Sequence, residues 1–102
     1  MKVIYEVNLK IDRKIKDDFR IWLTGHIQDV LAIEGFESAN WFEVDEKDLN
    51  MVTWTVHYGL RDLKALNSYL ENHAPRLRAP AKEKFGDMFQ ATRRTLELVK
   101  SY

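Results

Sequence analysis

The sequence contains 102 residues, of which 45% are hydrophobic and 12% aromatic, and its sixteen Lys and Arg residues balance sixteen Asp and Glu residues. This length and composition predict one folded domain over residues 1–102 and argue against intrinsic disorder. This balance of basic and acidic residues argues against nucleic acid and anionic membranes as main partners, because both are bound through a local excess of basic residues.

The N-terminal region has the pattern of a strand followed by that of a helix. Residues 2–11 alternate, and one face of the alternation consists of Val3, Tyr5, Val7, Leu9 and Ile11. Asp12 stands where an N-cap would, and apolar residues then recur at helical spacing. We therefore expect a strand at 2–11 and a helix at 13–32, which Gly35 closes.

Two further strands are predicted next, at residues 35–44 and 51–60, and the charged segment DEKDLN between them reads as a turn. In the later strand, Trp54 shares one face with Val52, Val56 and Tyr58. His57 shares the opposite face with Thr53 and Thr55.

The second half returns to helical spacing over residues 61–73. We expect Pro75 to end that helix, Pro75 and Pro80 each to open a short helical piece, and Gly86 to stop the last piece. The segment 87–99 has β-branched and aromatic residues typical of a strand, although its end could also be helical. We predict a strand there, because a fourth strand completes an antiparallel sheet.

The resulting order, βαββαβ, predicts an α+β fold of the ferredoxin-like type, with a four-stranded antiparallel sheet and its helices on one face. The other sheet face must then meet solvent or a partner. By the alternation it carries Ile4, Glu6, Asn8, Thr53, Thr55 and His57, together with either Arg93 or Arg94, and Trp41. This mixed character favours a homodimer, and we expect Ile4, Glu6, Thr55 and His57 at the contact.

His26 is the best candidate for chemistry, because it follows Trp22 by four residues on the apolar stripe of the first helix. Tyr5, Trp22, His26 and Trp54 are the predicted ligand-binding group, between helix and sheet. The alternative is a structural histidine within an aromatic core. Gly25 would weaken the helix unless a neighbouring element or a ligand packs closely against it.

Several functional classes lack their sequence signals. The three histidines show no metal-ligand spacing, no serine lies in a nucleophile elbow, and no glycine-rich loop could hold a phosphate, so we expect no metal and no cofactor. The absence of cysteine excludes disulfides and thiolate chemistry. With no signal-peptide block and no apolar run of membrane length, the chain is expected to be cytoplasmic.

Three segments together resemble a known bacterial family: VIYEVNL, WLTGHIQDVLAIEGFESANWF and YLENHAPRLRAPAKEKFGDMFQATRRTLEL. The most specific pieces are Trp22 with His26, the run His73-Ala74-Pro75 with Leu77-Arg78, Phe85-Gly86-Asp87, and Arg93-Arg94. The family is the domain of unknown function 4286. The resemblance implies a dimeric α+β barrel, in which two four-stranded sheets face each other. Its wider fold relatives include cofactor-independent monooxygenases, haem-degrading oxygenases and muconolactone isomerases, whose ligands lie between sheet and helices.

The main hypothesis is that the protein is an uncharacterised homodimeric domain, whose function is at most to bind a small molecule. One alternative is a cofactor-independent monooxygenase or isomerase for a small aromatic or quinone-like substrate, with His26 as acid or base. A cavity of roughly 300 Å³ or more beside His26 would favour the enzyme. A further alternative is nucleic-acid binding through the uncovered sheet face. For His73, Arg76 and Arg78, the sequence leaves open whether they are structural or border a pocket.

Overall fold

The computed structural model describes residues 2–102 and confirms the order βαββαβ. The strands are β1 (Val3–Asp12), β2 (Phe36–Val44), β3 (Met51–Leu60) and β4 (Phe89–Glu97). The helices are α1 (Lys16–Leu31), α2 (Leu63–Asn72) and α3 (Ala74–Phe85), with short 3-10 turns at Arg13–Ile15 and Gly86–Met88. The last segment is a strand, as the sequence predicts.

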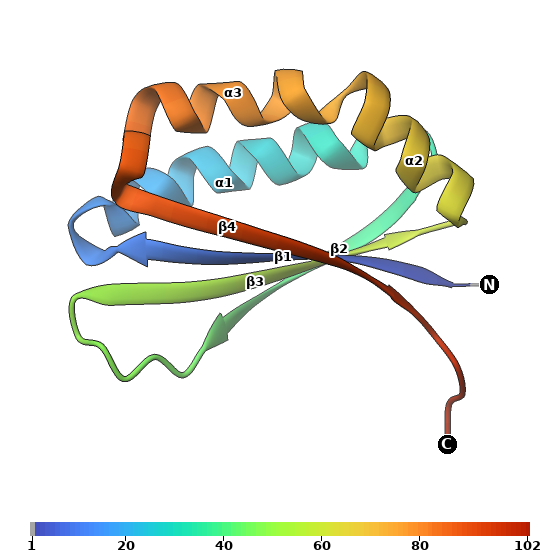
Figure 1. Cartoon of the computed structure of the whole chain (residues 1–102), viewed down its shortest axis with the longest axis horizontal. Helices are drawn as coiled ribbons and strands as arrows, with labels where there is room; N and C mark the ends of the chain where they lie inside the picture. Colours follow the sequence, from blue (N-terminus) through green and yellow to red (C-terminus); the bar gives the residue numbers. More distant parts are fainter. Residues whose placement is uncertain (1) are drawn as a thin grey trace.

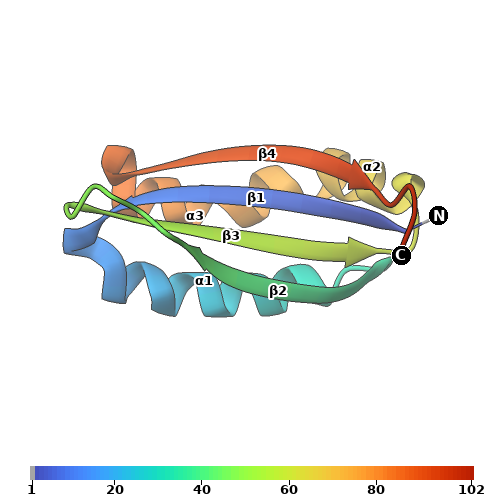
Figure 2. The ribbon, with the colours of Figure 1, turned by 90° about the horizontal axis from the view of Figure 1, so that it is seen from below.

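The four strands form one antiparallel sheet in the order β2-β3-β1-β4. All three helices lie on the same side of it, and the opposite side carries no helix (Figure 1). Seen from that opposite side, the four strands lie in front of the helices (Figure 2). The ferredoxin-like fold with one uncovered sheet face is therefore confirmed.

The core lies between the sheet and the helices, because each strand turns alternate residues toward them. From β1 and β3 these residues include Ile11, Trp54 and Leu60, and from α1 Phe19, all at most 1% exposed. Phe19 packs against Phe85 and Phe89, with ring centroids 5.0 Å away in both cases. Aromatic side chains from α1, α3 and β4 thereby fix the position of β4 against the helical layer.

Two local features differ from the sequence-based expectation. A β-bulge between Phe36 and Ser38 shifts the register of β2 against β3, so that Trp41 lies on the helix side, 4.9 Å from the ring of Trp54. Trp41 is therefore absent from the uncovered face. Pro80 lies inside α3 and does not open a helical piece, whereas Pro75 occupies the first turn of that helix.

Two glycines have opposite surroundings. Gly35 has a φ of +95°, and a Cβ built on it would lie 2.4 Å from the Cβ of Ala65, so both its conformation and its space require glycine. Gly25 lies within α1, and a Cβ there would meet no atom within 4 Å. The expectation that an element of this chain packs closely against Gly25 is therefore wrong.

This contrast predicts opposite effects of the same substitution. Gly25→Ala should stabilise the protein by about 0.8 kcal/mol, because alanine loses less backbone freedom in a helix. Gly35→Ala should destabilise it by more than about 1 kcal/mol, through strain at positive φ and the clash with Ala65. Urea unfolding of both variants measures this, and a change of the same sign in both would contradict it.

Candidate functional site

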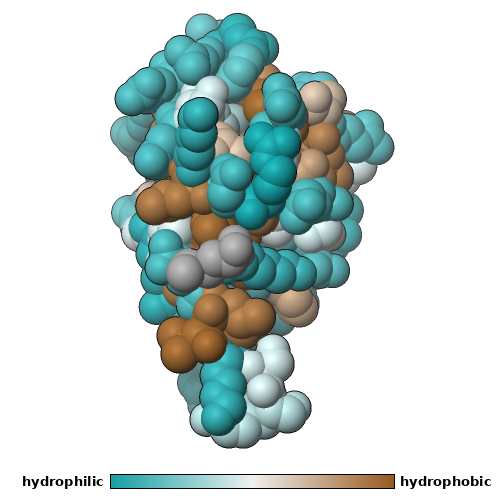
Figure 3. Space-filling model, turned by 90° about the vertical axis from the view of Figure 1, so that its right-hand side faces the viewer, coloured by the Kyte–Doolittle hydropathy of each residue, from teal (hydrophilic) through white to brown (hydrophobic). Residues whose placement is uncertain are grey.

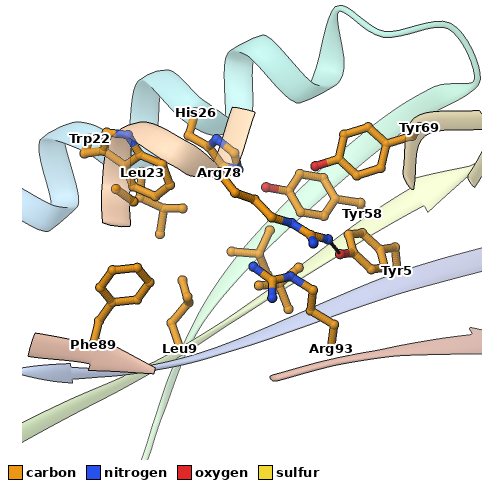
Figure 4. A pocket seen from close by; sticks show the side chains of 13 residues that line it. Tyr5, Leu9, Trp22, Leu23, His26, Tyr58, Tyr69, Arg78, Phe89 and Arg93 are labelled. Atoms are coloured by element: carbon orange, nitrogen blue, oxygen red, sulfur yellow. Dashed lines mark hydrogen bonds between the residues drawn. The ribbon is translucent and has the colours of Figure 1, made fainter. Parts of the chain in front are cut away.

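A cavity of about 50 Å³ lies between the sheet and the helices. Its walls come from every helix and from three strands, β1, β3 and β4. The lining residues are Tyr5, Val7, Leu9, Trp22, Leu23, His26, Val56, Tyr58, Tyr69, Arg78, Ala81, Phe89 and Arg93. Figure 4 shows Trp22, Leu23 and Phe89 toward one end of this space and the tyrosines toward the other. The cavity thus has an apolar end and a polar end.

Three tyrosines form the polar end. The rings of Tyr58 and Tyr69 each have their centroid 6.0 Å from that of Tyr5. Their hydroxyls come from β1, β3 and α2 and lie on the cavity side of the rings (Figure 4). Burial raises the pKa of Tyr58 and of Tyr69, so both hydroxyls stay protonated at neutral pH and can donate hydrogen bonds.

Two arginines reach the same end from opposite sides. Arg78 belongs to α3, and its Nη2 donates a 2.6 Å hydrogen bond to the hydroxyl of Tyr5. Arg93 belongs to β4 and also interacts with that hydroxyl. Burial and the positive charge of Arg78 both lower the pKa of Arg93. Two positively charged groups therefore lie at the same end of the cavity (Figure 4).

His26 lies beside this cavity, stacked on Trp22 with ring centroids 4.5 Å apart. The two residues are one helical turn apart, which places both rings on the same side of α1. Burial lowers the pKa of His26 to about 4. This value already includes the charges of Arg93 and Arg78, which also lower the pKa, and the charge of Asp29, which raises it. His26 is therefore neutral at pH 7 and can accept or donate a hydrogen bond.

The structure brings together three of the four residues expected to line one pocket, namely Tyr5, Trp22 and His26. Trp54 lies elsewhere. It is 1% exposed, its Nε1 donates to Glu43, and the guanidinium of Arg20 lies 5.1 Å from its ring centroid. These contacts direct Trp54 toward β2 and α1, and it does not line the cavity.

Arg78 and Arg93 were not among the residues predicted for this site, although the sequence holds a signal for each. Arg78 follows Ala74 by four residues and precedes Ala81 by three, which places it on the buried stripe of α3. Arg93 shares the parity of Phe89 on β4 and therefore points toward the helices. In both cases the signal is a charged residue on the face that otherwise turns apolar side chains toward the core.

His73 and Arg76 stay outside the cavity. Nη2 of Arg76 lies 2.9 Å from Nδ1 of His73, and this pair borders a separate, open surface depression over α1 and α3. Among the three residues whose role the sequence left open, only Arg78 turns inward to the cavity.

The uncovered sheet face carries a second polar cluster, centred on Glu6. Its carboxylate accepts hydrogen bonds from Arg94 at 2.6 Å and from Asn8 at 3.0 Å, and Nε2 of His57 lies 2.7 Å away. Hydrogen bonding by Arg94 is the main reason why the pKa of Glu6 falls to about 2. The predicted contact residues Ile4, Glu6, Thr55 and His57 all lie on this face.

Within residues 2–102 there is no group of three or more His, Asp or Glu side chains that could hold a metal ion. In the same part of the chain, every helix is too short or too polar to cross a membrane.

A family model described as a domain of unknown function, DUF4286, matches residues 2–99, which agrees with the resemblance seen in the sequence. None of the curated proteins matches the chain.

Several solved structures share the fold at low identity. SnoaB, a cofactor-independent oxygenase from Streptomyces nogalater, is 12% identical, with 99% of this chain and 97% of that chain covered and a TM-score of 0.72. A protein from Deinococcus radiodurans, provisionally assigned as an antibiotic biosynthesis monooxygenase, is 15% identical, with 98% and 95% covered and a TM-score of 0.74. The de novo designed protein Foldit4 is 16% identical, with 96% and 99% covered and a TM-score of 0.63. A fold shared by an oxygenase and a designed protein does not fix a function.

The Glu6 cluster predicts a specific dependence of stability on pH. The pKa of Glu6 lies below its usual value, so its ionised form stabilises the folded state above about pH 4.5, and this contribution is lost as the pH falls toward 2. Glu6→Gln should therefore lower the free energy of unfolding by about 2 kcal/mol at pH 7 and by much less near pH 2.

Urea unfolding of both proteins across this pH range measures the difference. The matched control is Glu37→Gln at an exposed position of β2, which should change stability by less than about 0.5 kcal/mol. A difference between the natural protein and the Glu6 variant that stays constant with pH would contradict the prediction.

Proposed function

The chain belongs to the DUF4286 family. We propose that it is a homodimeric domain that binds a small molecule between its sheet and its helices. The observation that carries the binding proposal is the cavity lined by apolar side chains at one end and by converging polar groups at the other. Ligand sites in proteins combine an apolar wall with a few fixed polar groups in this way.

The size of the cavity limits what can bind there. One water molecule needs about 10–15 Å³ by the same kind of measure, so a volume of about 50 Å³ has room for a group of only a few heavy atoms. His26 and Arg78, which line the cavity, are only partly buried, and the cavity is not fully enclosed. A ligand would therefore place a small head group inside and keep its remainder at the mouth.

The second candidate function is a cofactor-independent oxygenase or isomerase, with His26 as the acid or base. One observation favours it: His26 lines the cavity, and its pKa of about 4 leaves the ring neutral at pH 7. The same low pKa makes the ring a weak general base, because the most effective base has a pKa near the working pH. The cavity volume opposes it, because about 50 Å³ is far below the roughly 300 Å³ at which ordinary ligand pockets begin. Binding is therefore the leading proposal.

For the homodimer we propose the uncovered sheet face as the contact. Glu6 is 6% exposed and Thr55 8%, although no helix covers them, because neighbouring polar side chains enclose them. Arg94 balances the charge of Glu6, so the centre of the face can meet its own copy without like-charge repulsion. Phe42 adds apolar surface to the same face and is 49% exposed.

The C-terminal segment supports the same contact. It leaves β4 on the side of the sheet that faces away from the helices (Figure 1). Leu98 and Val99 in this segment are 51% and 97% exposed. Hydrophobic side chains are visible below the helical layer at the end of the molecule where both termini lie (Figure 3). A second copy on the uncovered face would remove this apolar surface from water.

Filling the cavity should abolish small-molecule binding. Ala81 lines the cavity from α3, and Ala81→Val adds two methyl groups there, whereas Ala79→Val makes the same change at an exposed position of the same helix. A panel of phenol, hydroquinone, benzoate and benzamide, followed by NMR shifts of Trp22 and Tyr69, should show binding to the natural protein and to the Ala79 variant only. Equal binding to the Ala81 variant, or shifts confined to other surfaces, would contradict the proposal.

The dimer is tested by sedimentation equilibrium at micromolar concentration, where the natural protein should be dimeric. Phe42→Asp places a charge on the uncovered face and should raise the dimer dissociation constant at least tenfold, about 1.4 kcal/mol. Ile21→Asp is the control, because Ile21 is 72% exposed on α1, on the helical side. A monomeric natural protein, or equal weakening by both variants, would refute this arrangement.

A further inference from the structure

We propose that the cavity is a site for a small carboxylate, which the guanidinium groups of Arg78 and Arg93 hold between them. This inference rests on the proposed binding function and adds the chemical class of the ligand. It is carried by the position of the two arginines, by the partners that they have, and by the shape and chemistry of the space beside them.

The two arginines stand on faces that otherwise carry apolar side chains. Arg78 lies half-buried on the stripe of α3 that also holds Ala74, Ala81 and Phe85. Arg93 lies on the inward face of the edge strand β4, where its side chain lines the cavity although the residue remains exposed to water. The like charges of the two guanidinium groups repel, so an anion placed between them is favoured.

No carboxylate of residues 2–102 supplies such an anion. Five ion pairs occur in this part of the chain, and neither Arg78 nor Arg93 takes part in any of them. Arg94, one residue further along β4, lies 2.6 Å from Glu6 on the other face of the sheet. The inward arginines have only neutral partners, above all the hydroxyl of Tyr5. Each guanidinium has five N–H donors, so donors remain available for a ligand.

The space beside the arginines fits a carboxylate. Its volume of about 50 Å³ suits a planar group of a few atoms, and guanidinium and carboxylate groups form paired hydrogen bonds with matching geometry. The hydroxyls of Tyr58 and Tyr69 stay protonated and face the same space as further donors. The carboxylate would occupy this space, and the carbon skeleton of the ligand would remain at the mouth of the cavity.

The test compares benzoate with benzamide, which has nearly the same shape and no charge. Both are titrated into isotopically labelled protein, and the Nε–Hε signals of Arg78 and Arg93 are followed by NMR. Benzoate should bind at least tenfold more tightly than benzamide. Arg78→Gln and Arg93→Gln should each weaken benzoate binding at least tenfold and leave benzamide binding nearly unchanged.

Two variants with the same loss of charge serve as controls. Arg76→Gln changes an exposed residue of α3, and Arg94→Gln changes the neighbour of Arg93 on the other sheet face. Neither should alter benzoate affinity more than twofold. Thermal unfolding of all four variants shows whether each one folds. Equal effects of Arg76→Gln and Arg78→Gln would mean that benzoate responds to net charge alone, and this would overturn the proposal.

His26 gives an independent readout. The charged groups that act on it are Asp29 from its own helix, Arg78 from α3 and Arg93 from β4. A carboxylate between the arginines offsets their positive charge, so saturation with benzoate should raise the pKa of His26 above its value of about 4 in the free protein. Saturation with benzamide should leave that pKa unchanged. A His26 titration that is identical with both ligands would contradict the proposed position of the carboxylate.

Failure of this inference is distinguishable from failure of the binding function. Equal affinity for benzoate and benzamide, with no loss in the arginine variants, would overturn the carboxylate site while small-molecule binding stands. Binding of phenol or hydroquinone without benzoate would have the same meaning. Tighter binding of inorganic phosphate than of benzoate would overturn the carboxylate class. Absence of binding by every probe would overturn both.

Discussion

The alternation of side chains along β4 is the constraint on which both polar sites depend. Arg93 and Arg94 are adjacent in the chain, yet they lie on opposite faces of the sheet, because successive residues of a strand point in opposite directions. The helices cover only one of these faces. One arginine therefore enters the space between sheet and helices, and the other joins the cluster on the uncovered face.

The charged side chains of the two sheet faces differ in whether they have partners of opposite charge. On the uncovered face Arg94, Glu6 and His57 form a compact cluster, in which the carboxylate of Glu6 is paired with Arg94 and contacts His57. On the covered face Arg78 and Arg93 meet only tyrosine hydroxyls among the described residues. A compensated cluster suits a contact with an identical surface, whereas an uncompensated pair of cations suits an anion from outside the chain. The dimer and the ligand site thus follow from one sheet with one covered face.

The sequence was sufficient for the fold and for the residues that β1 and β3 place on the uncovered face, because strand alternation and helical spacing are local properties of the chain. It was insufficient where one residue changes the register or where distant elements meet. The bulge between Phe36 and Ser38 places Trp41 on the helix side, and no sequence feature of that segment predicts the bulge. Trp54 has the parity of the core, but its partners on β2 and α1 hold it away from the cavity. Arg78 and Arg93 are fifteen positions apart and meet only through packing.

The most direct measurement is a crystal structure of the natural protein grown with benzoate. We expect the carboxylate of benzoate between the guanidinium groups of Arg78 and Arg93, with N–O distances of about 2.7–2.9 Å. We also expect a second copy of the chain against the uncovered sheet face. A structure in which a carboxylate of the protein itself pairs with these arginines, or in which both turn to solvent and benzoate is bound elsewhere, would contradict the proposed carboxylate site.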